Sequence, residues 1–98
     1  MQAHAKSYTA EDVFTSLGYP NPIDAARQQA RMILLGRLAR YQAEVQQMES
    51  KWGCTLKDMR ARYTVMAHED FQADDDYLQW QWYVDAIEAV NAQLAAIA

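Results

Sequence analysis

Apolar residues recur every three or four positions through the middle of the chain, from about residue 22 to residue 51. This spacing places the side chains on one face of an α-helix, which has 3.6 residues per turn. Apolar neighbours at Ile33 and Leu35 widen the face, so the helix is expected to pack against more than one neighbour. The pattern predicts a long helix whose apolar face is made by Ile23, Ala26, Ala30, Leu34, Leu38, Tyr41, Val45, Met48 and Trp52.

A second stretch, residues 74–97, repeats the same three-and-four spacing and predicts a second long helix. Its start is expected at three consecutive aspartates, because negative charge is favourable at a helix amino terminus. Between the two stretches, Gly53 ends the first helix, and Thr55 with Asp58 forms a capping arrangement for a short helix over 56–63. Residues 64–73 are ambiguous and are expected to form a loop or a frayed turn.

A short helix over residues 10–17 is predicted ahead of the first long one. Thr9 is a suitable N-cap, and Gly18 is a suitable helix stop because glycine tolerates the left-handed conformation. The two prolines of residues 19–22 make a connector, after which Asn21 caps the long helix and Pro22 takes its first position. Gly36, inside the long helix, either costs up to ~1 kcal/mol relative to alanine or marks a close helix crossing.

Composition agrees with an all-α fold. The 98 residues are 51% apolar and contain only 3 glycines and 2 prolines, so helix breakers are few. The predicted architecture is two long antiparallel helices with a short helix between them and a short helix at the amino terminus. We expect residues 1–21 to form a lead-in and residues 22–98 a hairpin-like helical domain.

Charge is distributed unevenly. Residues 27–62 carry eight basic and three acidic residues, whereas residues 63–98 carry seven acids and no Lys or Arg. One interpretation is internal, with a basic helix beside an acidic one; the other is that the acidic third faces a basic partner protein. Nucleic acid is not an expected partner, because phosphate contacts need clustered Lys and Arg on an available surface.

Catalytic, metal and cofactor sites are not expected. Cys54 has no evident histidine partner, and the acids at 69–70 and 74–76 lack the spacing that would converge three ligands on one ion. A small enzyme subunit using Cys54 or His68 stays as the last-ranked alternative. No run of ~18 apolar residues is present and residues 1–20 lack the pattern of a signal peptide, so we expect a cytoplasmic protein without a membrane span.

Trp80 and Trp82 are two positions apart, so on a helix they point in directions about 200° apart. Both cannot face one internal neighbour, and the same holds for Tyr77 and Leu78. One interpretation is that one tryptophan is half exposed and unremarkable. The other, which we favour, is a second burial surface in contact with another chain, since large aromatic residues are enriched at interfaces.

Residues 11–26 resemble the amino-terminal lead-in of Xre-type antitoxins from bacterial toxin–antitoxin pairs. Val13, Phe14, Leu17, Gly18, Pro20 and Asp24 carry the resemblance, whereas Ser16 stands where those proteins prefer an acid. The DNA-reading helix-turn-helix of that family does not follow. Residues 38–85 instead are similar to small helical candidate antitoxins, through the break at Trp52–Thr55 and the acidic-to-aromatic run at residues 74–80.

The resemblance implies a type II antitoxin-like protein that sequesters a small basic toxin by covering its active surface, without turnover. A homodimeric, self-associating helical module stays as the alternative, because the same apolar faces could close a dimer. The candidate partner-binding residues are the lead-in anchors and the acidic-aromatic start of the second long helix: Val13, Phe14, Leu17, Tyr19, Asp74, Asp75, Asp76, Tyr77, Trp80 and Trp82.

Overall fold

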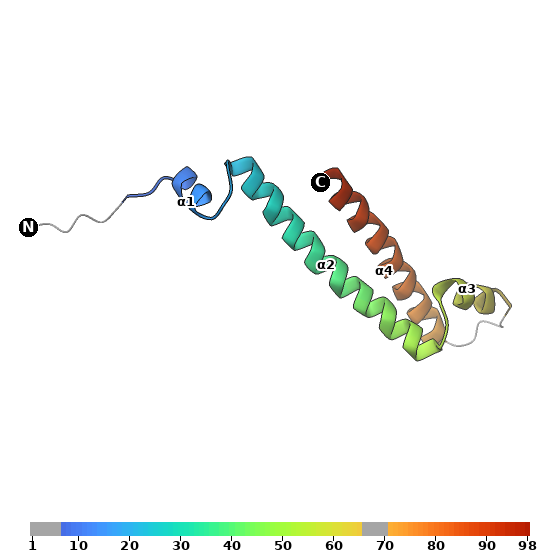
Figure 1. The fold of residues 1–98 in the computed structure, drawn as a ribbon. Coiled ribbons are helices and arrows are strands. Elements are labelled where there is room, and N and C mark those ends of the chain that lie inside the picture. The colour runs from blue at the N-terminus through green and yellow to red at the C-terminus, as the bar shows by residue number, and fades with distance from the viewer. Residues whose placement is uncertain (1–6, 66–70) are drawn as a thin grey trace, which may run out of the picture. The chain divides into compact units, whose positions relative to one another are not determined.

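The computed structural model describes residues 7–65 and 71–98, and these residues form four helices and no strand (Figure 1). The predicted all-helical class is therefore confirmed. The helices are α1 (Ala10–Ser16), α2 (Pro22–Trp52), α3 (Leu56–Val65) and α4 (Phe71–Ala96).

The ends of α1 follow from local sequence signals, as predicted. The Asp12 N–H donates to Thr9 Oγ1 at 3.1 Å, and the Thr9 N–H donates to Asp12 Oδ2 at 3.0 Å. This reciprocal capping box satisfies two backbone donors that a helix start would otherwise leave unpaired. After the helix, Gly18 adopts φ +92°, a left-handed conformation that costs glycine little. Thr9 and Gly18 thus set the limits of α1.

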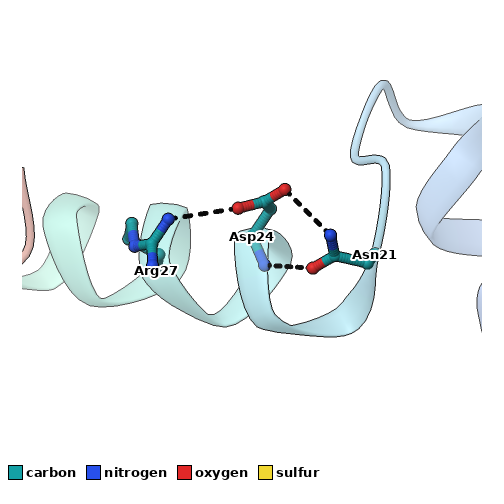
Figure 2. A network of polar contacts seen from close by, with 3 residues as sticks. All are labelled: Asn21, Asp24 and Arg27. Atoms are coloured by element: carbon teal, nitrogen blue, oxygen red, sulfur yellow. Dashed lines mark hydrogen bonds and ion pairs between the residues drawn. The ribbon is translucent and has the colours of Figure 1, made fainter.

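The start of α2 is fixed by a polar network of Asn21, Asp24 and Arg27 (Figure 2). The Asp24 N–H donates to Asn21 Oδ1 at 2.9 Å, and Asn21 Nδ2 donates back to Asp24 Oδ2 at 3.1 Å. Arg27 Nη1 donates to the other carboxylate oxygen, Oδ1, at 3.2 Å. Asn21 is therefore the predicted cap, and the Asp24 carboxylate stabilises the first turn through its position beside the helix dipole.

Two predictions about the helix boundaries are wrong. The second long helix begins at Phe71, so the three aspartates lie within its first two turns instead of opening it. Of the segment expected as a loop, residues 64–65 belong to α3 and residues 71–73 to α4, while residues 66–70 lie outside the described part of the chain. The helix can start early because Ala73, only 4% exposed, is buried in the core.

Gly36 does not mark a close helix crossing. No described atom lies within 4 Å of the position that a Cβ at this residue would occupy. The glycine therefore weakens the helix without making room for a neighbour. Gly53 differs, because its φ of +66° is the left-handed conformation that ends α2.

The contacts within the chain divide it into two units, Met1–Ile33 and Leu34–Ala98. The hydrophobic core lies in the second unit and is centred on Trp80, which has no exposed surface, with Met59 and Ala73 beside it. Seven partly buried side chains from α2, α3, α4 and the α2–α3 turn complete this core: Val45, Met48, Trp52, Cys54, Leu56, Tyr77 and Val84.

Polar contacts at Asp76 connect α2 and α4 at the edge of this core. Trp52 Nε1 donates to Asp76 Oδ2 at 3.0 Å, and Lys51 Nζ lies 2.6 Å from the same oxygen. Earlier in α2 and later in α4, the Tyr41 and Trp82 rings meet edge-on, with centroids 5.5 Å apart. The Lys51–Asp76 pair is one point at which basic and acidic stretches of the chain compensate each other, as the internal interpretation of the charge pattern expects.

Candidate protein-binding site

An open groove of about 510 Å³ lies between α1, the connector and the first turns of α2. Most of its lining is apolar. Three lining residues, Phe14, Leu17 and Tyr19, are among the predicted partner-binding residues, and Leu17 is 66% exposed. The full lining is Phe14, Leu17, Tyr19, Pro22, Ala25, Ala26, Gln29 and Met32.

The turn after α1 brings the three predicted residues to this groove. The Tyr19 N–H donates to the Phe14 carbonyl oxygen at 2.8 Å, and the Leu17 N–H donates to the Val13 and Phe14 carbonyl oxygens at 3.1 and 3.2 Å. These bonds fold the chain back across the end of α1, which the left-handed Gly18 permits. A residue without glycine's freedom at this position would strain the turn that shapes the groove.

Several large apolar side chains are exposed in the described part of unit Met1–Ile33. α1 contains no buried residue, and Val13, Ile23 and Met32 are all exposed. Ile23 and Leu34 lie on the same predicted face of α2, yet Ile23 is 71% exposed and Leu34 is buried. The described residues therefore leave this face exposed at Ile23 and cover it at Leu34. Apolar surface of this kind, when contiguous, is typical of a binding site.

Of the predicted acidic residues, Asp75 is exposed, Asp74 is partly exposed and Asp76 is buried. Asp76 accepts from Trp52 and pairs with Lys51, so it acts within the fold. Tyr77 is partly buried against the core, and its hydroxyl accepts a hydrogen bond from Arg60 Nε at 3.1 Å. Asp74 and Asp75 are thus the members of the aspartate run that reach the surface of α4.

Trp80 and Trp82 have opposite environments, as their spacing predicts. Trp80 is fully buried in the core, so it is a structural residue and offers no surface to another protein. Its Nε1 atom finds no hydrogen-bond partner among the described residues. Trp82 is 57% exposed, and its ring packs edge-on against Tyr41 and Tyr83. Trp82 is therefore the tryptophan that remains available for contact.

A second groove, which the sequence did not predict, lies between α2 and α4 in unit Leu34–Ala98. Its volume is about 370 Å³. Small residues of α4 form part of its lining, with Trp82 and Asp85 beside them and Arg37 contributed by α2. The lining is Arg37, Tyr41, Trp82, Asp85, Ala86, Ala89, Val90 and Gln93.

The sequence predictions also concern possible metal ligands, Cys54 and the helices. Within residues 7–65 and 71–98, no group of three His, Cys, Asp or Glu side chains is placed to hold a metal ion. Cys54 is partly buried and packs against the core, and His68 lies outside the described residues. None of the described helices is both long and apolar enough to span a membrane.

Comparison of the chain with protein-family models, with curated proteins and with solved structures finds no match in any of the three.

Proposed function

We propose that the chain is a non-catalytic protein-binding module whose principal contact surface is the groove between α1 and α2. The observation that carries this proposal is the groove itself, lined by Phe14, Leu17 and Met32 and open to solvent. Apolar side chains that fill such a groove contribute most of the affinity of many small interfaces. A partner side chain or short helix that enters it buries surface which this unit leaves exposed.

The partner is a small basic protein. Residues 63–98 contain seven acids and no Lys or Arg, and Asp75 and Glu88 are exposed on α4. One acid, Asp76, is compensated internally by Lys51. Exposed carboxylates attract a basic protein during the encounter, while the apolar groove supplies the contact that holds it.

The resemblance of residues 11–26 to Xre-type antitoxin lead-ins supports a more specific role, in which this module sequesters a toxin. The resembling residues form α1, its glycine turn and the start of α2, which together build the groove. The mechanism is steric: the bound module covers the toxin's active surface, and no bond is made or broken. One copy of the module is sufficient to cover one toxin active site.

The long helices α2 and α4 run antiparallel in this proposal. Two contacts favour that order, because Trp52 near the end of α2 meets Asp76 near the start of α4, while the earlier Tyr41 meets the later Trp82. This arrangement gives the second unit a core of its own around Trp80.

Co-expression with the protein encoded next to this chain in its genome tests the toxin-binding role. Leu17→Asp places a charge in the groove, whereas Ile23→Asp places one on an equally exposed apolar position outside its lining. We expect the wild-type chain and Ile23→Asp to restore growth, and Leu17→Asp to fail. A neighbour that is not toxic, or rescue by Leu17→Asp equal to that of the wild type, contradicts the proposal.

A further inference from the structure

The exposed face of α4 carries large apolar side chains in its first half and smaller side chains beside a groove in its second. Leu78 and Trp82 are both exposed, at 65% and 57% of their surface. Seven and eleven residues after Leu78, at spacings that return to the same helix face, stand Asp85 and Ala89, which are also exposed. One face of one helix thus presents large apolar side chains followed by small ones.

The groove between α2 and α4 lies over the small half of this face. Ala86 and Ala89 line it from α4, and Arg37 lines it from α2. Small side chains let the surface of another helix approach closely, and the volume of about 370 Å³ is open to a large side chain. Trp82 lies at one end of the same groove, where its edge-on contact with Tyr41 orients its ring.

We propose that this face of α4 is a homodimer interface, in which two copies pack α4 against α4 antiparallel and each Trp82 enters the partner copy's groove over Ala89. The bulky half of one copy then meets the small half of the other, twice, as a two-fold axis requires. A parallel arrangement would place the two Trp82 side chains against each other and leave the space over Ala86 and Ala89 empty.

Charge supports the antiparallel arrangement. With the axis between residues 85 and 86, Asp85 of each copy lies over Ala86 of the other and beside the Arg37 that lines that groove. Asp85 is already oriented by Gln81, whose Nε2 donates to its Oδ1 at 2.9 Å. Two Asp85–Arg37 contacts between the copies place opposite charges together, whereas the parallel arrangement aligns the acids of α4 with each other.

Sedimentation equilibrium of the full chain at tens of micromolar tests the dimer. We expect a dimer whose dissociation constant rises about tenfold or more on Trp82→Ala, as for a central aromatic anchor. Ala89→Trp should have a similar effect, because it fills the groove at an exposed position and leaves Trp82 in place. Ile23→Ala is the matched control and should leave the dimer unchanged. Unaltered helical circular dichroism shows that each variant folds.

Disulfide cross-linking tests the antiparallel geometry. In a Cys54→Ser background, Ala86→Cys lies next to the two-fold axis and should form a covalent dimer on mild oxidation, while Glu88→Cys, outside the groove lining, should not. A monomeric wild-type chain, a dimer that tolerates both Trp82→Ala and Ala89→Trp, or equal cross-linking of the two cysteine variants overturns the inference. Leu17→Asp should leave this dimer intact, so failure of the toxin-binding proposal is distinguishable from failure of this one.

Discussion

Asp76 provides a quantitative test of the contact between α2 and α4. Its Oδ2 atom accepts a hydrogen bond from Trp52 Nε1 at 3.0 Å and lies 2.6 Å from Lys51 Nζ. The Asp76 side chain is only 12% exposed, whereas that of Lys51 is 44% exposed. Asp76→Ala removes both contacts and leaves the indole N–H of Trp52 without this acceptor.

The two contacts differ in size because their exposure differs. A hydrogen bond to a charged group stabilises by about 1.5–3 kcal/mol. The pair with the half-exposed Lys51 is screened by water and adds about 0–1 kcal/mol. We therefore expect Asp76→Ala to lower the free energy of unfolding by ~2–3 kcal/mol, or Tm by about 10–20 °C in a domain of this size. Asp76→Asn keeps an oxygen acceptor for Trp52 and should cost ~1 kcal/mol.

Urea unfolding followed by circular dichroism measures these differences. Lys51→Met separates the two contacts, because it removes the ion pair and keeps the indole hydrogen bond; its expected cost is ~0.5 kcal/mol or less. A cost of Lys51→Met equal to that of Asp76→Ala would refute the ranking of the two contacts. A loss below about 0.5 kcal/mol for Asp76→Ala would mean that this contact does not stabilise the fold.

Three further predictions concern the two tryptophans of α4, two glycines and the cap of α1. In urea unfolding, Trp80→Ala should lower the free energy of unfolding by ~3–5 kcal/mol, because it leaves a cavity in the core. Trp80→Phe should lower it far less, since this change also removes an indole N–H that has no partner among the described residues. Trp82→Phe, at an exposed position, should change it by no more than ~0.5 kcal/mol. Gly36→Ala should stabilise the chain by up to ~1 kcal/mol and Gly53→Ala should destabilise it by ~1 kcal/mol, as measured by thermal unfolding, because only Gly53 is left-handed. Thr9→Ala should speed amide hydrogen exchange within α1, where a cap is worth about 0.5–2 kcal/mol, and leave the exchange of α4 unchanged.

The sequence predicts the helices well where their limits depend on local chemistry. The capping pairs Thr9–Asp12 and Asn21–Asp24 act over three residues, and a glycine stop acts at its own φ angle, so tertiary contacts need not be known. The sequence does not predict the start of α4 correctly, because that start depends on tertiary packing. The aspartate run has the charge of a helix start, but the burial of Ala73 in the core extends the helix towards Phe71, and that burial depends on packing.

The candidate site was predictable only in part. The spacing of Phe14 and Leu17 indicates one apolar side of α1, but the contribution of Ala25 and Met32 from α2 depends on how the turn at Gly18 folds the chain back. The spacing of Trp80 and Trp82 likewise shows that the two side chains point in different directions from the helix. It does not reveal which of them is buried, because residues of one type carry the same local signal and only the packing distinguishes them.

Calorimetric titration of this chain with the basic protein that it captures from its native host, both purified, tests whether the groove between α1 and α2 is the binding surface. We predict that Leu17→Ala weakens binding about tenfold or more, that Ile23→Ala changes it little, and that added salt weakens binding by the wild-type chain. Equal losses for the two variants, or no loss for Leu17→Ala, would contradict the assignment of the groove between α1 and α2 as the binding surface. Binding that does not respond to salt would contradict the role given to the acids of α4.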